Sequence, residues 1–306
     1  MFVLNTVVIF MRTQLKSFFT LVFILSNFIV MGQQEIEIHG HRGARGYLPE
    51  NTIPSFIRAI ELGATAIELD VVISKDGRVV VSHEPYMSAA ICLDSLGQQL
   101  KNPSKNHNIY EMNYAQIACY DCGSIKHSRF PEQENIKVVK PLLEDVVDAV
   151  ENYVKQQGIA PVVFNVEVKS DPKGDHTHHP EPARYVGILV ELLRSKNINN
   201  HLIVQSFDER ILQELHRQAP EITISFLVAN LNSFESNIES LGFQPAYYTP
   251  FYKLLNKRKV KEIHASGIKV GAWTVNKPKE IRRMINIGVD AIISDYPDRV
   301  KSLSLK

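Results

Sequence analysis

Two histidines and three carboxylates stand at the ends of β-rich segments, where they could share one reaction. His41 and His83 each close a short β-rich run, and Glu68 and Asp70 lie two residues apart on another. Alternate residues of a strand face the same side, so these two carboxylates share one face. Glu167 supplies a third carboxylate from a further run. Three carboxylates with water molecules suit a hard divalent cation, so we expect one Mg²⁺ or Ca²⁺ here.

An ion-pair network without metal is the alternative for these carboxylates. Arg42 and Lys169 lie beside the same runs and could neutralise them. Inward-facing like charges are nevertheless costly without a cation between them, which favours the metal. We therefore expect Arg42 and Lys169 to bind an anionic phosphate, which a guanidinium can hold with two hydrogen bonds.

The two strand-end histidines are candidates for proton transfer. Such a pair can divide general-base and general-acid duties near neutral pH. His39 is expected to lie just outside the site. His176, His178 and His179 lie among Asp, Gly and Pro residues, and we interpret them as a solvated loop, with incidental metal binding as the alternative.

Three residues that end later runs are candidates for substrate contacts. Gln205 and Phe207 close one run, and Trp273, the only Trp of the chain, closes another. We assign all three to substrate binding. For Trp273, packing in the core is the alternative to forming a wall of the site.

These residues need a scaffold in which many strand ends meet. Short runs that are apolar on both faces alternate with amphipathic patterns, which indicates parallel strands joined by helices. About eight such units fit a (β/α)8 TIM barrel, an α/β fold whose reactive residues gather at the C-terminal ends of its strands. The predicted strands are 35–41, 66–73, 79–83, 162–169, 202–207, 223–228, 246–249, 269–275 and 291–294. The predicted helices are 52–63, 141–153, 181–194, 208–218, 257–266 and 278–287.

Residues from about 86 to 139 break this rhythm and are rich in Asn, Lys, Ser and Pro. They follow the third β-run, so we expect an insertion that forms a lid or subdomain at the barrel mouth. All three cysteines lie within it, namely Cys92, Cys119 and Cys122. A local disulfide between Cys119 and Cys122, or simple packing, is expected there rather than a redox or metal function.

The first 32 residues have the composition of a secretory signal peptide. Arg12 and Lys16 precede an apolar run from 18 to 31, and the small Gly32 offers a cleavage site. We expect a mature domain of residues 33–306, periplasmic or secreted, with no stable membrane insertion after cleavage. A permanent membrane anchor is the alternative, although the two cations interrupt the apolar stretch.

Charge limits the partners of the chain. The formal net charge is +1, which argues against a protein that binds nucleic acid by bulk electrostatics. A small anionic substrate fits, because a few local cations suffice to bind it. The sequence does not indicate an oligomeric state.

The order of these residues resembles the glycerophosphodiester phosphodiesterase family, in its exported bacterial form. The stretch HRGARGYLPENT at 41–52, then Glu68-Leu-Asp70 and His83-Glu84, resembles the family's opening blocks. Later blocks follow in order at 167–169, 205–207, 273–276 and 288–297. The resemblance spans 38–300, nearly the whole expected mature chain.

The resemblance implies a TIM barrel that hydrolyses a glycerophosphodiester to glycerol 3-phosphate and an alcohol. It implies that the two histidines are acid and base and that the three carboxylates hold the metal. Glu50 and Asn51 would stand beside these ligands, and Arg42 and Lys169 would bind phosphate. One departure is Glu84, where many members have Asp, and another is Leu142, where Thr is common in the same block. Neither departure touches the implied chemistry, but both leave the alcohol of the substrate open.

Two other functions compete with this one. A phospholipase acting on intact lipids occurs on related barrels, but the sequence shows no apolar rim or basic membrane face. A catalytically inactive binding module would lack an acid, a base or a metal ligand, and all of these are present.

Overall fold

The computed structural model describes residues 35–101 and 107–305. The chain divides into Met1–Glu35 and Ile36–Lys306, and the second unit carries all the elements given below. The expected signal peptide, residues 1–32, lies outside the described residues.

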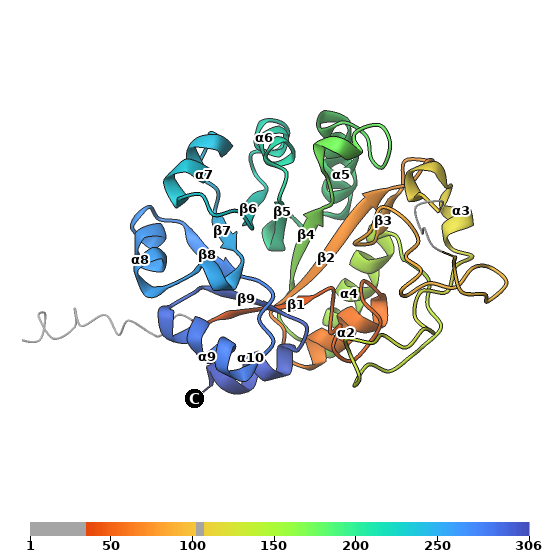
Figure 1. Cartoon of the computed structure of the whole chain (residues 1–306), viewed down its shortest axis with the longest axis horizontal. Helices are drawn as coiled ribbons and strands as arrows, with labels where there is room; N and C mark the ends of the chain where they lie inside the picture. Colours follow the sequence, from red (N-terminus) through yellow and green to blue (C-terminus); the bar gives the residue numbers. More distant parts are fainter. Residues whose placement is uncertain (1–34, 102–106, 306) are drawn as a thin grey trace, which may run out of the picture. The chain divides into compact units, whose positions relative to one another are not determined.

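Eight parallel strands of the described chain close into a barrel (Figure 1). The first of them pairs with the second on one side and with the last on the other, which closes the ring. In chain order the barrel strands are β1 (Glu37–His41), β2 (Ala66–Ile73), β4 (Val163–Val168), β5 (Leu202–Ser206), β6 (Thr223–Val228), β7 (Tyr247–Pro250), β8 (Lys269–Ala272) and β9 (Ala291–Ser294). The prediction of a (β/α)8 TIM barrel is confirmed.

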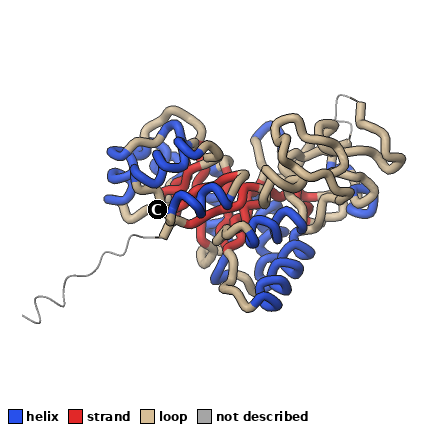
Figure 2. Tube along the Cα trace, turned by 90° about the horizontal axis from the view of Figure 1, so that it is seen from below, coloured by secondary structure: helices blue, strands red, loops and turns tan. Residues whose placement is uncertain are grey.

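Helices surround the strands, as Figure 2 shows. Helix α2 begins after Thr52, whose hydroxyl accepts a hydrogen bond from the Ser55 N–H, and Pro54 fits its first turn. The α-helices are α2 (Ile53–Glu61), α3 (Tyr114–Ile117), α4 (Leu143–Gln157), α5 (Pro182–Lys196), α6 (Glu209–Gln218), α7 (Phe234–Leu241), α8 (Lys257–Ala265), α9 (Pro278–Ile287) and α10 (Pro297–Ser304). The short 3₁₀ helices are η2 (Ile109–Glu111), η3 (Pro172–Gly174), η4 (Asn199–His201) and η5 (Tyr252–Leu254). The sequence patterns do not predict the short helices α3, α7 and α10, which have four, eight and eight residues.

The third β-run differs from the others because it is not a barrel strand. It forms β3 (Val79–Val81), which pairs antiparallel with the far end of β2. The Ser82 N–H then donates to the Asp70 carbonyl at 2.9 Å. This hairpin folds the chain back to the level of Asp70, so His83 reaches the same end of the barrel without ending a barrel strand.

The insertion at 86–139 contributes to a second, small hydrophobic cluster. Met87 and Ile117 are fully buried in it, against Val72 of β2 and Val80 of β3. The insertion is therefore packed against the β2–β3 hairpin that delivers the second histidine.

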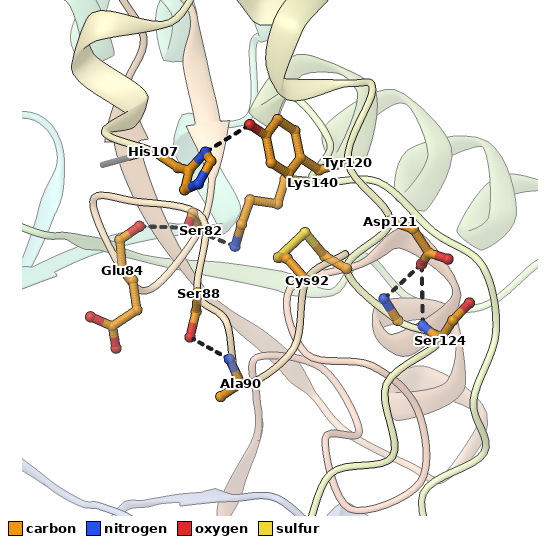
Figure 3. The surroundings of a disulfide bond; sticks show 12 residues. Ser82, Glu84, Ser88, Ala90, Cys92, His107, Tyr120, Asp121, Ser124 and Lys140 are labelled. Carbon is orange, nitrogen blue, oxygen red and sulfur yellow. Dashed lines mark hydrogen bonds between the residues drawn. A yellow bond between two sulfur atoms is a disulfide. The ribbon is translucent and has the colours of Figure 1, made fainter. Parts of the chain in front are cut away.

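A disulfide within the described residues joins Cys92 to Cys122 across the insertion (Figure 3). Backbone hydrogen bonds of 2.7 and 3.2 Å between Leu93 and Asp121 hold the two flanking segments side by side. Cys119 lies just after α3 and is exposed and unpaired. The predicted disulfide between Cys119 and Cys122 is therefore wrong, because the pairing follows contacts between segments far apart in sequence.

Replacing Cys92 by Ser should destabilise the protein by about 2–4 kcal/mol, the usual range for a disulfide that closes a loop of moderate length. The Cys92–Cys122 bond spans 30 residues, so its loss frees a substantial loop in the unfolded chain. Urea unfolding without reductant measures the effect, and Cys119→Ser is the matched control. Equal losses in the two variants would contradict the assigned pairing.

Candidate active site

The three predicted metal ligands lie together, Glu68 and Asp70 in the middle of β2 and Glu167 near the C-terminal end of β4. Glu68, Asp70 and Glu167 are buried, and each offers one carboxylate oxygen to a group whose atoms lie within 4.8 Å of one another. The parallel register of the two strands sets Asp70 opposite Glu167. Oxygen ligands bind Mg²⁺ or Ca²⁺ at about 2.0–2.6 Å, so one divalent cation fits among them.

Hydrogen bonds orient two of these carboxylates. Glu68 Oε2 accepts from the Arg42 N–H at 2.9 Å, and Glu68 Oε1 accepts from Gln205 Nε2 at 3.1 Å. Asp70 Oδ2 accepts from Asn51 Nδ2 at 2.8 Å. Asp70 Oδ1 is buried and has no hydrogen-bond partner among the described residues. A buried oxygen of this kind needs a partner, and a metal ion would supply one.

The charges of the three carboxylates conflict with one another. Burial raises the pKa of Glu68 well above its usual range, and the charges of Asp70 and Glu167 raise it further. Burial also raises the pKa of Glu167, although Lys169 Nζ, 2.6 Å from its Oε1, opposes the shift. Burial would raise the pKa of Asp70 too, but the charge of Arg42 holds it below its usual range. A divalent cation would relieve the remaining repulsion.

The loop after β1 carries unusual backbone conformations where it meets the carboxylates. Arg42 and Asn51 have φ of 54° and 58°, which is the left-handed region. A hydrogen bond of 3.0 Å from the Asn51 N–H to the Arg42 carbonyl joins them. Gly43 has φ of 85°, and a Cβ there would lie 2.5 Å from Ser55 Oγ. Such conformations persist only where the surroundings fix them, and here they aim the Arg42 N–H at Glu68.

Glu50 lies between two arginines of the same loop. Its Oε1 accepts from Arg42 Nη1 at 2.8 Å, and its Oε2 accepts from Arg45 Nη1 at 3.1 Å. Burial would raise the pKa of Glu50, but the two arginines hold it well below its usual range. Gln133 of the insertion donates to the Arg45 carbonyl at 2.7 Å. Glu50 therefore holds Arg42, the residue that we expect to bind phosphate, while Gln133 ties the neighbouring Arg45 to the insertion.

His41 is held by a buried aspartate that directly follows the last barrel strand. Its Nδ1 lies 2.7 Å from Asp295 Oδ1, which also accepts from Arg45 Nε at 2.8 Å. Asn276 Nδ2 donates to the other oxygen of Asp295 at 2.6 Å. Burial lowers the pKa of His41 to about 4, against the opposing effect of Asp295. The imidazole is therefore neutral at pH 7, with Nδ1–H donated to the aspartate and Nε2 left as the basic nitrogen.

His83 stands on the turn after β3 and is more accessible. Its side chain is 29% exposed, and its Nδ1 lies 2.8 Å from Glu84 Oε1. Behind this turn, Lys140 Nζ donates to Ser82 Oγ at 2.9 Å, and Ser82 Oγ donates to the Glu84 carbonyl at 2.7 Å (Figure 3). Lys140 is buried. The two histidines thus have different settings, one enclosed beside an aspartate and the other open beside a glutamate.

A cavity of about 380 Å³ brings most of the predicted site residues together, although Glu50, Asn51 and Asp70 are not among its lining residues. Phe207 and Trp273 form an aromatic wall, with ring centroids 5.2 Å apart. Trp273 Nε1 donates to the Thr249 carbonyl at 2.9 Å, so this residue both lines the cavity and is anchored in the barrel. Among the predicted residues the lining includes His41, Arg42, Glu68, His83, Glu167, Lys169, Gln205, Phe207 and Trp273. Their individual roles stay predictions.

Several residues around the site are not predicted from the sequence. Arg129 of the insertion lines the cavity, which brings the insertion to the mouth of the barrel. Arg45 lies within the matched first block, and Asp295 directly follows the last predicted strand. Both positions could be noticed in the sequence, but their partnership with His41 depends on β9 lying beside β1.

A chain of buried hydrogen bonds runs up the barrel interior to Glu68. Asn165 Nδ2 lies 3.1 Å from His39 Nδ1 and also donates to Gln205 Oε1 at 3.1 Å. Gln205 Nε2 then donates to Glu68 at 3.1 Å. All four side chains are buried. His39 lies outside the cavity, as expected, and this chain fixes which end of the Gln205 amide faces the carboxylate.

Asn165→Leu should weaken metal binding and activity by about 10- to 100-fold, the usual cost of losing a partner that orients a ligand. Without Asn165, the Gln205 amide can rotate and present its oxygen to Glu68. Calorimetric titration with Mg²⁺ or Ca²⁺ measures the affinity independently of turnover. Ser225→Ala is the matched control, because Ser225 is buried in the barrel and its Oγ pairs only with Thr249 Oγ1 in the hydrogen bonds of the described residues. Equal metal affinity in both variants would refute this role.

The loop with three histidines is only partly solvated. His176 is exposed, but His179 is buried, with 3% of its surface accessible. His179 Nδ1 lies 2.9 Å from the Pro180 carbonyl, and its Nε2 lies 3.1 Å from the Asp171 N–H. The prediction of a solvated loop is wrong for His179, because the loop folds back on itself and the ring fills its centre.

Sequence and structure comparisons agree on one family. The model described as the Glycerophosphoryl diester phosphodiesterase family matches residues 41–299. A glycerophosphodiester phosphodiesterase of Caldanaerobacter subterraneus is 29% identical over 269 residues, which cover 87% of this chain and 96% of that protein.

Solved structures show the same fold. A crystal structure from Silicibacter pomeroyi DSS-3 matches with a TM-score of 0.80 and 31% identity, over 89% of this chain and 94% of that chain. A phosphodiesterase from Oleispira antarctica, solved in complex with the product sn-glycerol-3-phosphate, matches with a TM-score of 0.70 and 25% identity, over 88% and 97% of the two chains. Because the family model covers most of its length, this chain belongs to the glycerophosphoryl diester phosphodiesterase family.

Proposed function

We propose that this glycerophosphodiester phosphodiesterase hydrolyses its substrates to glycerol 3-phosphate and an alcohol in a metal-dependent reaction. The observation that carries the proposal is the buried carboxylate trio, two members of which, Glu68 and Glu167, line one cavity together with two histidines and two cations. The family membership and the named relative support the diester chemistry. The product complex of the Oleispira antarctica enzyme supports glycerol 3-phosphate as the product.

Glu68, Asp70 and Glu167 hold one divalent cation, Ca²⁺ or Mg²⁺, in this proposal. When bound, the cation neutralises charge on the phosphate and lowers the barrier to attack. Arg42 and Lys169 bind the remaining phosphate oxygens. Asp70 Oδ1 supports this assignment, because it has no hydrogen-bond partner among the described residues and its ion-pair contact with Lys169 Nζ is long, at 3.7 Å.

His41 acts as the base and His83 as the acid. The neutral His41 can accept a proton at Nε2 from the nucleophile. The nucleophile is either a water molecule, or the glycerol hydroxyl next to the ester, in which case a cyclic phosphate forms first and a water molecule then opens it to glycerol 3-phosphate. Asp295, 2.7 Å from Nδ1, then stabilises the imidazolium that forms. His83 donates a proton to the leaving alcohol oxygen, and Glu84 can pair with it while it is protonated.

A substrate panel tests the activity directly. Purified protein is incubated with glycerophosphodiesters of different alcohols, with and without each metal, and glycerol 3-phosphate is measured by an enzyme-coupled assay. Diacyl phospholipid vesicles form a separate arm that tests the phospholipase function. Release of glycerol 3-phosphate from none of the diesters, with metal content verified, would contradict the proposed function.

The proposal includes export of the protein after removal of residues 1–32. The basic start and apolar run of that segment support it. The Cys92–Cys122 disulfide also supports it, since disulfides persist in oxidising compartments. Within the described residues, no helix is long and apolar enough to cross a membrane.

N-terminal sequencing of protein from the periplasmic or culture fraction should find a start at Gln33. Signal peptidase cuts after small residues that follow an apolar core, and Gly32 follows the run that ends at Met31. Protein from the cytoplasmic fraction is the comparison. An exported protein that retains Met11 would refute cleavage at this site.

A further inference from the structure

A second cavity, of about 450 Å³, adjoins the first on the side of His83. The two cavities share three lining residues, namely His83, Glu84 and Lys169. The phosphate bound between Lys169 and the metal carboxylates would therefore face both cavities. A glycerophosphodiester carries two groups on its phosphate, a glycerol arm and an alcohol arm. Two connected cavities can bind one arm each.

The loop after β4 forms much of the second cavity, and internal contacts hold it in place. Asp171 Oδ1 accepts from the Lys173 N–H at 2.8 Å, and the buried His179 fills the loop's centre. Asn108 of the insertion donates to the Thr177 carbonyl at 2.6 Å, which anchors the loop from the other side. A loop fixed at both ends can present its side chains as a preformed site.

The positions of the two histidines decide which arm lies in which cavity. The attacking and leaving oxygens at phosphorus lie roughly in line, on opposite sides. His41 lines only the first cavity, whereas His83 lines both. With the base on one side and the acid on the other, the alcohol leaves toward the second cavity. The glycerol arm then lies against Phe207 and Trp273.

The charged side chains that line the second cavity balance one another, although carbon atoms make up most of the lined surface. Its carboxylates are Glu84 and Asp171, and its ammonium groups are Lys169 and Lys173. No Phe, Tyr or Trp is among its lining residues in the described chain, so a quaternary ammonium finds no aromatic face. His178 lines the cavity with a buried Nδ1 that has no hydrogen-bond partner among the described residues.

From these observations we infer that the second cavity binds the alcohol arm of the diester and selects a neutral, hydroxyl-rich alcohol such as glycerol or inositol. Hydroxyl groups both donate and accept, so they can satisfy carboxylates and ammonium groups together. This inference rests on the proposed function, because it assigns the second half of the same substrate.

The test compares kcat/KM for three diesters that share glycerol 3-phosphate and differ in the alcohol, which is glycerol, choline or methanol. The methyl diester barely enters the second cavity and therefore reports the proposed function alone. For the native chain we expect kcat/KM for the glycerol diester to exceed that for the choline diester by about 10-fold, the value of one or two hydrogen bonds. Preference for choline would overturn the inference, whereas failure to cleave the methyl diester would count against the function itself.

Two variants locate the selection in the cavity. His178→Ala should lower the ratio of kcat/KM for the glycerol diester to kcat/KM for the methyl diester. We expect a decrease of about 5-fold, which corresponds to the loss of one hydrogen bond. His176→Asn is the control, because His176 is exposed at φ of 61° and Asn tolerates that conformation. Lys173→Gln leaves the cavity with excess negative charge and should raise kcat/KM for the choline diester by about 2- to 5-fold, as expected for one solvent-accessible charge. Unchanged ratios in both variants would overturn the inference.

Discussion

His41→Ala and His83→Ala should each lower kcat on glycerophosphocholine by about 10²–10⁴-fold, with folding and metal content unchanged. An alkoxide is a poor leaving group, and the phosphate anion repels nucleophiles. The metal, Arg42 and Lys169 address the repulsion by neutralising charge. None of them supplies the proton that the leaving alcohol needs, which leaves proton transfer to the histidines.

Substrates with a different leaving group distinguish the histidine that acts as the acid from the histidine that acts as the base. The p-nitrophenolate anion leaves without protonation, so on p-nitrophenyl phosphodiesters the acid matters much less than the base. We expect His83→Ala to recover most of its lost rate on these substrates and His41→Ala to remain slow. His176→Asn serves as the control for replacing a histidine at the surface. Near wild-type rates on glycerophosphocholine in both alanine variants would show that the pair is wrongly assigned. If His41→Ala instead of His83→Ala recovers its rate on the p-nitrophenyl diesters, His41 is the acid and His83 the base.

The barrel could be predicted from the sequence because its strands carry a strong local signal. The strands at 66–73, 223–228 and 291–294 have the same bounds in prediction and structure. Buried parallel strands are apolar on both faces, and this pattern does not depend on distant contacts. The direction of β3 does depend on them, since an apolar run of three valines reads the same whether its partner is parallel or antiparallel.

In the candidate site, too, some residues can be recognised from the local sequence and others only from the folded barrel. The spacing of Glu68 and Asp70 shows that they share a face, and the strand-end rule adds Glu167. Asn165 lies two residues before Glu167 in the same apolar run, so both side chains face the same side of the strand. Its contact with Gln205 follows only from the closed barrel. Likewise, Asp295 meets His41 across 254 residues of sequence. Residues that orient other residues carry no local motif, so their roles emerge from topology.

Exhaustive chelation should abolish activity, and added Mg²⁺ or Ca²⁺ should restore it. Without a cation, three buried carboxylates repel both one another and the phosphate of the substrate. The same binding should stabilise the fold, because a ligand that binds only the native state adds about 2.7 kcal/mol at 100 times its Kd. A rise in Tm with metal concentration therefore reports binding without any turnover. Full activity after chelation, with metal absence verified by elemental analysis, would refute the assignment.

Glu68→Gln tests the ligand set at a single residue. The change removes one negative charge, and it also places an amide NH₂ where Glu68 now accepts from Gln205 and from the Arg42 N–H. One donor must then face another donor, so we expect metal affinity to fall by at least about 10-fold, as when a ligand's surroundings are disturbed. Glu61→Gln is the matched control, since Glu61 pairs with Arg58 on the surface and its side chain is 41% exposed. A drop in Tm without a loss of metal affinity would mean that Glu68 supports the barrel but does not bind the cation.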